Sequence, residues 1–551
     1  MADPRVKTLL GHGRRIATRA SDEAYFATAC FRAGIFGIEP PGRLAQMALL
    51  LERYGLLSAS LGISALRNAD RVVMHDELGV ITYRELDEET NALANAWREQ
   101  GVRAGDGIAI LVRNHRGFMQ ALFAAAKLGA KIILLNTSFA GPQIREVAQR
   151  EGTDMLVVDD EYVSMLDAIE PPRGRWRAWV DEPVQRGAPD TLAALIAAGS
   201  RARPPKSERG PRVVILTSGT TGTPKGAPRD EPRSLGIIGG ILSKVPLRAR
   251  ETTVLAAPMF HTLGLAGMLL SLSLGHTMVV HRRFDPERTL DALADHTAST
   301  MIVVPVMLQR MMELGDDQVR ARDLRALRII LASGSAISAD LVNRSIAAFG
   351  PVVYNMYGST EVAEATIATP ADLAVDPTTV GSAVRGTVLR ILDERGRELP
   401  AGTTGRIFVG NAAQFDGYTG GGDKERIGGL MSSGDVGHLD PDGRLYIDGR
   451  DDEMIVSGGE NVFPAEIENL LAGHAAIADV AAIGIEDEQF GQRLRAFVVV
   501  RVGHELSEQE IKDYVRENLA RYKVPREVVF LEELPRNPTG KVLKRELAVR
   551  D

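Results

Sequence analysis

The chain has 551 residues, 44% of them apolar and 25% charged, and 72 acidic against 65 basic residues give a net charge of −7. This length allows more than one domain, and the acidic balance argues against a nucleic-acid-binding protein that relies on overall basic charge. The one cysteine, Cys30, cannot form an internal disulfide, and no Cys–His signature surrounds it. We therefore expect a structural thiol and a reducing, cytoplasmic location.

Residues 1–75 are an N-terminal extension to which the sequence assigns no role, and no secretory signal is evident in it. Residues 43–66 place apolar side chains at helical spacing, which favours core packing or an oligomer face, as in a homodimer, over peripheral membrane contact. Glycines, serines and a histidine interrupt the apolar run 263–280, which therefore predicts a buried strand and helix. We expect no transmembrane segment.

Helix and strand patterns alternate from residue 82 onward. Residues 82–100 predict a helix with Leu86, Leu93 and Trp97 on one side. A buried strand at 108–112, a helix at 117–128 and a strand at 131–136 follow. This spacing is typical of a βαβ unit with a parallel sheet. Further short apolar runs end at turn residues, at 213–216, 253–258, 301–305 and 328–332.

The predicted secondary-structure pattern changes after about residue 385. Strand patterns with tight Gly and Pro turns continue to Arg450–Asp452, where acidic residues interrupt the apolar pattern. A compact α+β unit begins at Pro464. The predicted fold is α/β and multidomain: a large domain of βαβ-type sheets with a β-rich subdomain at 76–451, and a small α+β domain at 452–551.

The string LTSGTTGTPKG (216–226) follows a predicted strand. Its glycines let backbone N–H groups approach an anion, its hydroxyl groups add donors, and Lys225 adds a mobile positive charge. These are the groups that a triphosphate needs. The loop is not a Walker A loop, because Pro224 stands where the second glycine belongs and Gly226 replaces the Ser or Thr that would hold magnesium.

Four further strings combine polar side chains with turns. NMYGSTE (355–361) places a carboxylate among hydroxyl groups, and Mg²⁺ prefers such oxygen ligands. SSGD (432–435) offers a carboxylate that can accept hydrogen bonds from both hydroxyls of a ribose. PMFH (258–261) carries a histidine in an apolar stretch, and NPTGKVLKR (537–545) carries a glycine-flanked lysine. Each of these residues alone is more typical of a surface turn or a packed core.

Together and in this order, the strings resemble the signature blocks of the adenylate-forming superfamily, which includes acyl-CoA synthetases, luciferases and carrier-protein adenylation domains. The resemblance runs from about residue 75 to the C-terminus and is strongest to bacterial fatty-acid–CoA ligases. It implies that the chain uses ATP, Mg²⁺ and coenzyme A. It assigns the triphosphate to Thr217, Ser218, Gly219, Thr220, Thr221, Gly222 and Lys225.

The same resemblance assigns the rest of the nucleotide site. Tyr357 matches the ring that stacks on adenine, and Glu361 matches the magnesium ligand. Thr360 matches a phosphate contact, and Asp435 and Arg450 match two contacts to the ribose. The remaining residues of the implied nucleotide site are Gly334, Ser335, Asn355, Gly358 and Ser359.

By resemblance, catalysis involves two orientations of the small domain. Lys541 matches the catalytic lysine, whose charge would stabilise the negative charge that builds up on the carboxylate and the α-phosphate. Thr217 and Glu361 share this catalytic assignment. Asp452 matches the hinge about which the mobile C-terminal domain would swing, and Gly459 would then line the tunnel for the pantetheine arm of coenzyme A.

The acid and the thiol acceptor are less constrained. His261 and Gly358 match the acyl pocket, with His261 at its mouth. The neighbouring runs 259–274 and 362–384 are apolar apart from Glu364, which favours an apolar monocarboxylate and above all a fatty acid. An aromatic acid is the alternative. After Gly226 the chain departs from many relatives, so the nearby pocket wall is expected to differ.

Coenzyme A is favoured as the acceptor because no inserted segment that would hinder the swing of the small domain is evident. A fatty acyl-AMP ligase that passes the acyl group to an acyl carrier protein is the alternative. A scaffold protein without catalysis is disfavoured, because the charged residues of every motif are present.

Overall fold

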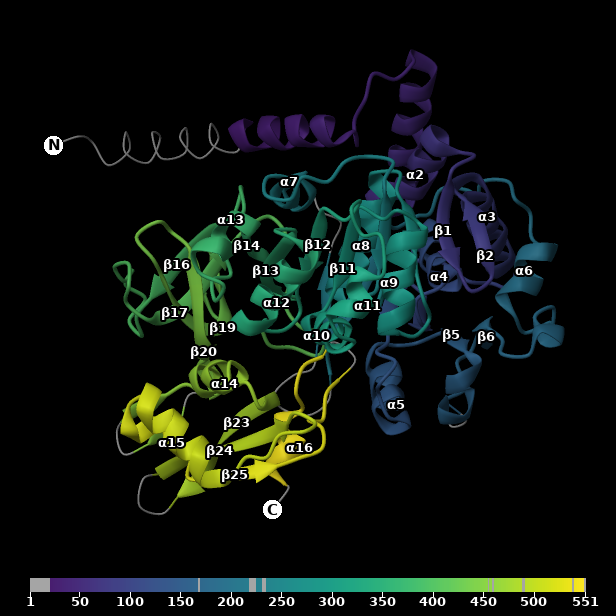
Figure 1. Ribbon diagram of the computed structural model, residues 1–551. Coiled ribbons are helices and arrows are strands. Elements are labelled where there is room, and N and C mark those ends of the chain that lie inside the picture. Colours follow the sequence, from purple (N-terminus) through teal and green to yellow (C-terminus); the bar gives the residue numbers. More distant parts are fainter. Residues whose placement is uncertain are drawn as a thin grey trace.

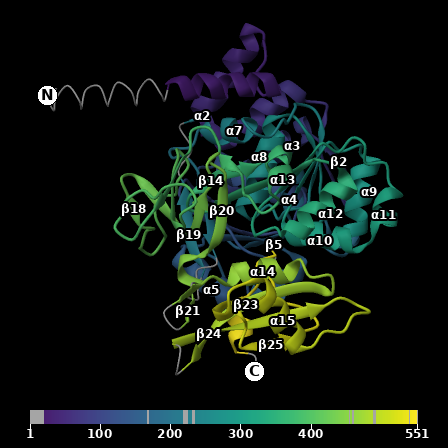
Figure 2. The ribbon, with the colours of Figure 1, turned by 60° about the vertical axis from the view of Figure 1, so that its left-hand side comes forward.

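The computed structural model describes residues 20–549 apart from 167–168, 218–223, 230–233, 454, 458–459, 488–490 and 538–539. These residues form a large N-terminal domain with three sheets and a small C-terminal domain with a fourth (Figure 1). A second view shows the small domain below the large one (Figure 2). This arrangement confirms the predicted α/β multidomain fold.

The first βαβ units build a six-stranded sheet in the order β6-β5-β3-β4-β7-β8. All neighbouring strands are parallel except β7 and β8. The strands are β3 (Gly107–Leu111), β4 (Lys131–Leu134), β5 (Met155–Asp159), β6 (Arg175–Trp179), β7 (Arg212–Thr217) and β8 (Lys225–Arg229). The strands predicted at 108–112, 131–136 and 213–216 are therefore confirmed.

The second sheet has nine strands in the order β15-β14-β13-β12-β11-β9-β10-β1-β2, parallel from β13 to β1 and antiparallel at both edges. It includes the runs predicted at 253–258, 301–305 and 328–332. Its strands are β1 (Val72–Asp76), β2 (Gly79–Thr82), β9 (Thr252–Leu255), β10 (Thr277–Val279), β11 (Thr300–Val303), β12 (Ile329–Ala332), β13 (Val353–Ser359), β14 (Ala363–Ala368) and β15 (Ser382–Ala383).

Helices cover these sheets and share one core with them. The helix predicted over 82–100 is α3 (Tyr83–Glu99), which begins at a capping box between Thr82 and Glu85 and buries Leu86, Leu93 and Trp97. It packs against α4 (Arg116–Lys127), which contacts β3, β4 and β6. The other helices are α5 (Gly141–Arg150), α6 (Leu192–Ala198), α7 (Gly236–Leu242), α8 (Thr262–Ser273), α9 (Pro286–Asp295), α10 (Pro305–Glu313), α11 (Asp316–Arg320), α12 (Ala339–Phe349) and α13 (Pro370–Val375).

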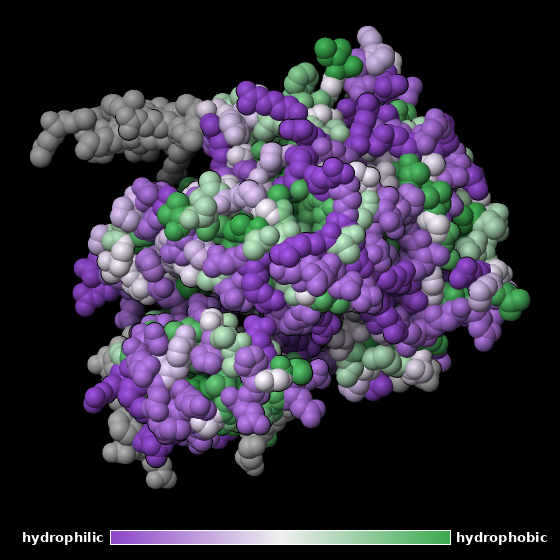
Figure 3. Space-filling model, viewed as in Figure 1, coloured by the Kyte–Doolittle hydropathy of each residue, from purple (hydrophilic) through white to green (hydrophobic). Residues whose placement is uncertain are grey.

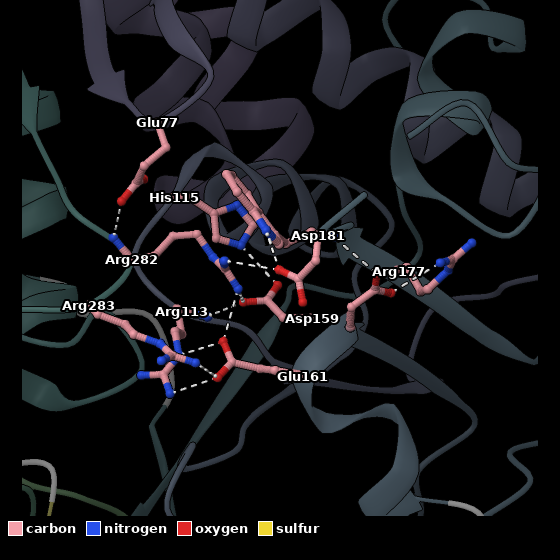
Figure 4. A network of polar contacts seen from close by, with 11 residues as sticks. Glu77, Arg113, His115, Asp159, Glu161, Arg177, Asp181, Arg282 and Arg283 are labelled. Carbon is pink, nitrogen blue, oxygen red and sulfur yellow. Dashed lines mark hydrogen bonds and ion pairs between the residues drawn. The ribbon is translucent and has the colours of Figure 1, made fainter. Parts of the chain in front are cut away.

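A network of charged residues joins the ends of the two sheets (Figure 4). Arg282, which follows β10, donates to Glu161 at 2.9 Å, and its backbone N–H donates to Glu77 at 2.8 Å. Arg113, which follows β3, also donates to Glu161, at 2.7 Å. Because paired charges from both sheets meet here, the network fixes one sheet against the other.

The remaining sheets form the β-rich subdomain and the small domain. The subdomain is antiparallel and consists of β16 (Val388–Leu392), β17 (Gly405–Gly410), β18 (Arg426–Ile427), β19 (Leu430–Leu439) and β20 (Leu445–Arg450). A short 3₁₀ turn, η3 (Asp451–Glu453), leads into the small domain. Its elements are β21 (Ile455–Ser457), β22 (Glu460–Val462), α14 (Pro464–Ala472), β23 (Ile477–Asp487), β24 (Gly491–Val500), α15 (Glu508–Asn518), β25 (Glu527–Phe530) and α16 (Lys544–Ala548).

The N-terminal extension forms a helix over 20–33 followed by α2 (Pro41–Asn68). Cys30 is fully buried, and burial raises the pKa of its thiol to about 11, as expected for a structural cysteine. The helix expected over 43–66 is broken at Gly55, whose φ is 74°. The part after the break is largely buried, but most of the part before it is exposed, so core packing explains only the second half.

In the part of the chain that the structure describes, α2 is the one helix long and apolar enough to cross a membrane by length and composition. The run predicted at 263–280 as a buried helix and strand is confirmed as α8 followed by β10.

Candidate active site

Strands β7 and β8 form the stem of the loop at 216–226. They pair antiparallel with Thr217 opposite Lys225, so the loop joins two strands and does not lead into a helix. The Lys225 ammonium lies 5.2 Å from the centre of the Tyr418 ring. The predicted phosphate contacts Ser218, Gly219, Thr220, Thr221 and Gly222 lie outside the described residues, as does the side chain of Thr217.

Thr419 anchors the β7–β8 stem through two hydrogen bonds. Its backbone N–H donates to the carbonyl of Gly226 at 2.9 Å, and its hydroxyl donates to Glu151 at 2.5 Å. The Glu151 side chain is fully buried and also accepts from Lys131 and Arg150, each at 2.9 Å. Burial alone would raise the pKa of Glu151, but the hydrogen bonds from Thr419, Lys131 and Arg150 outweigh it and lower the pKa. The stem is thus fixed to a charged cluster that stays ionised.

Glu361 lies at the turn after β13, and its residue is 9% exposed. Tyr418 donates its phenolic hydrogen to Glu361 Oε1 at 2.8 Å. Burial and then the Glu361 charge raise the pKa of Tyr418, so the phenol stays protonated and remains a donor. Tyr418 therefore contacts Glu361 through its hydroxyl and Lys225 through its ring.

The described residues contain no group of three or more His, Cys, Asp or Glu side chains that could hold a metal ion. A lone carboxylate nevertheless fits Mg²⁺, which nucleotide-binding proteins hold through one or two carboxylates while substrate phosphates supply other oxygens. Glu361 meets this requirement. Thr360 lies beside it, with its hydroxyl 2.9 Å from that of Thr262 at the start of α8.

Asp435 and Arg450 face each other across β19 and β20, where they are register partners. Arg450 Nη1 donates to Asp435 Oδ1 at 3.2 Å, and Tyr357 donates its hydroxyl to Asp435 Oδ2 at 2.5 Å. Burial and the Asp435 charge raise the pKa of Tyr357 well above its usual value. The neutral Tyr357 phenol and the Arg450 guanidinium therefore both orient the Asp435 carboxylate, whose side chain is 12% exposed.

Further predicted nucleotide-binding residues lie at the carboxyl ends of β12 and β13 in the nine-stranded sheet. Ala332, the last residue of β12, pairs with Asn355 in β13, so Gly334 and Ser335 emerge beside the segment 355–361. Gly334 has a φ of 101°, a conformation that favours glycine. A Cβ at Gly358 would collide with the carbonyl oxygen of Ala363, and Ser359 accepts from the backbone N–H of Glu361 at 3.2 Å.

His261 lies just before α8, with Nε2 at 3.4 Å from Asn136 Nδ2. Burial and then the charge of Lys541 lower the pKa of His261 to about 3, so the ring is neutral near pH 7. Asn114, which the sequence did not single out, positions the loop that carries His261. Its Oδ1 accepts from Met259 N at 2.8 Å and its Nδ2 donates to the carbonyl of Ala257 at 2.9 Å.

Lys541 comes from the small domain, on a loop that packs against α10 of the large domain. Desolvation and Arg450 lower the pKa of Lys541, against the opposing charges of Asp435, Glu361 and Glu453. The structure thus brings Lys541 within electrostatic reach of the predicted nucleotide residues.

Contacts between the domains hold Lys541 in this place. A Cβ at Gly540 would collide with Val306 of α10, which shows how closely the lysine loop approaches the large domain. Gln309 of α10 donates to the carbonyl of Ala478 at 3.0 Å. Gly459 lies outside the described residues, as does the side chain of Asp452 in η3, and their assignments as tunnel and hinge stay predictions.

The fold joins a large domain to a small C-terminal domain, and the predicted nucleotide-binding residues lie where the two domains meet. The family model of the AMP-binding enzymes matches residues 63–419, more than half of the chain, and that of the AMP-binding enzyme C-terminal domain matches 466–541. The chain belongs to the AMP-binding enzyme family. The predictions of the adenylate-forming superfamily and of an acid–thiol ligase are confirmed.

Individual relatives differ in acid and acceptor. The chain is 30% identical to a fatty acid–[acyl-carrier-protein] ligase of Streptomyces coeruleorubidus, over 85% of this chain and 91% of the relative. It is 33% identical to an indoleacetate–CoA ligase of Aromatoleum aromaticum, over 85% and 94%. A solved o-succinylbenzoate–CoA synthetase of Bacillus subtilis with its acyl-adenylate is 25% identical, with a TM-score of 0.77 over 89% and 98% of the two chains.

Proposed function

We propose that the protein joins a fatty acid to coenzyme A. In the first half-reaction the carboxylate oxygen attacks the α-phosphorus of ATP and pyrophosphate leaves. In the second, the thiol sulfur attacks the carbonyl carbon of the acyl-adenylate and AMP leaves. Positioning and neutralisation of charge dominate such phosphoryl chemistry.

The placement of Lys541 is the observation that carries this proposal. Its ammonium is within electrostatic reach of Arg450, Asp435 and Glu361, three residues of the proposed nucleotide site. A cation at this point would stabilise the negative charge that develops as the carboxylate and the α-phosphate react. Burial lowers the pKa of Lys541, and the approach of an anionic triphosphate would favour its charged form.

The other residues of the proposed site would each bind a different part of the nucleotide. Asp435 and Arg450 would bind the ribose, and Tyr357 would stack on the adenine. Glu361 would hold Mg²⁺, which supplies positive charge to the phosphates when bound. Lys225 extends from the stem of the phosphate loop toward the same cleft, where Tyr418 lies beside both Lys225 and Glu361.

The apolar residues beside His261 support an apolar acid. The buried face of α8 and the loop before it is formed by Met259, Leu263, Leu265 and Met268. A neutral His261 adds no charge to the pocket mouth, so a long uncharged chain enters without leaving an ion unpaired. This supports a fatty acid. The aromatic acid remains the second candidate, since one relative is an indoleacetate–CoA ligase.

For the second half-reaction the small domain would turn about Asp452 so that Lys541 leaves and Gly459 enters. Coenzyme A is our proposed acceptor. An acyl carrier protein is the rival, because one relative transfers fatty acids to such a protein. The two acceptors are distinguished by product analysis.

A panel of acids tests the proposal directly. Pyrophosphate release and thioester formation should be measured with acetate, medium- and long-chain fatty acids, indoleacetate and a cinnamate, with coenzyme A or a phosphopantetheinylated carrier protein. Fatty-acid-dependent pyrophosphate release with acyl-CoA as the product is expected. Acid-dependent release without any CoA thioester would overturn the choice of acceptor.

Lys541→Ala tests the half-reaction to which the lysine belongs. Adenylate formation should fall by roughly 10²–10³-fold, the loss typical when one charge-stabilising donor is removed. Thioester formation from chemically prepared acyl-AMP should change little. Lys512→Ala, on α15 of the same domain, is the matched control. Equal losses in both half-reactions would show that Lys541 does not act in one orientation alone.

A further inference from the structure

The N-terminal helices expose an unusual amount of apolar surface. Of the fifteen large apolar side chains that the described residues expose, seven lie between residues 31 and 56. Ile38 is 96% exposed, and Phe36, Leu44, Leu49 and Leu51 are 40–57% exposed. Figure 3 shows hydrophobic residues on the corner that projects at the top of the molecule, where Figure 1 places the start of α2. We call residues 36–51 the apolar corner.

The exposed side chains of the apolar corner cover more than one face of α2. Leu44, Ala48 and Leu51 follow one face at i, i+4 and i+7, and Ala45 and Leu49 lie on the next. The break at Gly55 separates this part from the buried second half of the helix. The exposed face of this segment is therefore largely apolar, and such a face can enter the headgroup–acyl boundary of a lipid surface.

A basic stretch flanks the base of the apolar corner. Residues 201–212 contain five basic residues and one acidic residue, and all five basic residues are exposed, namely Arg201, Arg203, Lys206, Arg209 and Arg212. This stretch contacts α2 directly. Arg53 and Tyr54 donate to the carbonyl of Pro204 at 2.9 Å and 2.5 Å, and Lys206 forms an ion pair with Glu52.

This basic character is local. The whole chain carries a net charge of −7, whereas the stretch 201–212 carries five positive charges against one negative. Positive charge is therefore concentrated next to the apolar corner of an otherwise acidic protein.

Charge decides between the two occupants that an apolar surface could have. In a symmetric dimer the same patch meets itself, so two basic stretches would be brought together and would repel each other. An anionic lipid surface instead attracts lysine and arginine side chains while its acyl region accepts the apolar ones. The combination of both features favours lipid.

We propose that the apolar corner and the basic stretch 201–212 form a docking surface for an anionic lipid bilayer. Leu44, Leu49 and their neighbours enter the headgroup–acyl boundary, and the basic residues contact lipid phosphates. The contact is peripheral and reversible, because α2 is broken at Gly55 and its second half is packed in the core. The docking surface requires neither ATP nor an acid, so it does not depend on the proposed ligase reaction.

The helix over 20–33 connects this surface to the proposed acyl side of the enzyme. Phe26 is 2% exposed and packs against Gly239 of α7 and Gly386. Glu23 accepts from the hydroxyl of Ser234 and from the backbone N–H of Leu235, just before α7. The apolar corner is thus attached to the segments that flank the proposed acyl pocket.

Co-sedimentation of the full-length protein with vesicles tests the docking surface. The wild-type protein should bind vesicles of phosphatidylcholine with phosphatidylglycerol, should bind pure phosphatidylcholine weakly, and should lose binding as salt rises. L44E/L49E and, separately, R203E/R209E should each weaken binding by at least roughly tenfold, since each removes one of the two attractions.

Two matched variants serve as controls. V502E places the same charge on an exposed apolar residue of the small domain, and R320E/R325E reverses two exposed arginines in and beside α11. Both should bind as the wild type does, and melting temperatures should show that all variants are folded. The proposal is overturned if the wild type stays in the supernatant with both vesicle types or if L44E/L49E binds normally. A dimer in light scattering that L44E/L49E converts to a monomer would assign the surface to a second copy instead.

Discussion

Tyr418 touches both charged residues that we place next to the triphosphate. Its hydroxyl donates to Glu361 at 2.8 Å, and its ring faces the Lys225 ammonium at 5.2 Å. A buried carboxylate without a partner is costly, and Tyr418 supplies a partner in the absence of a metal. The residue therefore orients the Glu361 carboxyl group before magnesium and ATP arrive.

Tyr418→Phe should raise the KM for Mg–ATP by roughly tenfold, the size of one hydrogen bond to a charged group, with less change in kcat. The KM for the acid should stay the same, because the lost bond lies on the nucleotide side. Tyr446→Phe is the control, since Tyr446 stacks on His438 in the β-rich subdomain. An unchanged KM for Mg–ATP in Tyr418→Phe would remove Tyr418 from the nucleotide site.

Short sequence motifs predicted the site residues that lie within them. They did not predict the supporting residues, which lie far away in the sequence. The structure places Tyr357, Glu361, Asp435, Arg450 and Lys541 near one another, and their roles toward a nucleotide stay predictions. The supporting residues were missed for a physical reason, because each meets a partner far along the chain. Tyr418 is 57 residues from Glu361, Asn114 is 145 from Met259, and Thr419 is 268 from Glu151.

At the scale of elements, the β7–β8 stem depends on close packing behind it. A Cβ at Gly226 would collide with the Thr419 hydroxyl and lie 2.8 Å from both Glu151 Oε1 and Val214 Cγ1. None of these atoms has room to move freely, because Thr419 and Glu151 are tied to each other and Glu151 is tied to two cations. A larger residue than glycine therefore does not fit at position 226 without displacing these atoms.

Gly226→Ala should lower the free energy of unfolding by about 1–3 kcal/mol, the usual cost of overpacking, and should impair ATP binding. Gly210→Ala is the matched control, since a Cβ at Gly210 meets no atom within 4 Å. Thermal melting and ATP titration of both variants measure the two effects. Equal melting temperatures would mean that the stem shifts without strain.

Regular periodicity predicted the elements well and their interruptions poorly. The strands and helices from 82 to 136 appear where apolar spacing placed them. The stem strand β8 was not foreseen, because KGAPR contains a glycine and a proline and becomes a strand only by pairing with β7. The break at Gly55 also escaped, since one positive φ does not disturb the apolar spacing of α2.

At the scale of the whole molecule, the orientation of the small domain decides whether Lys541 reaches the cleft. Gly540 packs directly on Val306 with a φ of 78°. A methyl group there would push the lysine loop off α10 without touching the phosphate loop. The acid–AMP step should therefore suffer, while the step that uses the other orientation should not.

Gly540→Ala should slow adenylate formation by about 10²-fold, the effect of misplacing a reacting group by about 1 Å. Thioester formation from prepared acyl-AMP should be nearly unchanged. Gly503→Ala is the matched control, because Gly503 has a similar φ of 85° in the same domain but open space around it. A similar loss in both variants would attribute the effect to backbone strain, not to domain contact.

Val304 lies near both the proposed adenine site and the lysine loop of the small domain. A Cβ at Gly334, beside the proposed adenine site, would lie 3.4 Å from Val304, and one at Gly540 would lie 3.9 Å from the same side chain. Nucleotide binding at the proposed adenine site and packing of the lysine loop against the large domain therefore both involve Val304. Thermodynamic reciprocity follows: by whatever factor the seated domain strengthens nucleotide affinity, bound nucleotide must strengthen domain seating by the same factor.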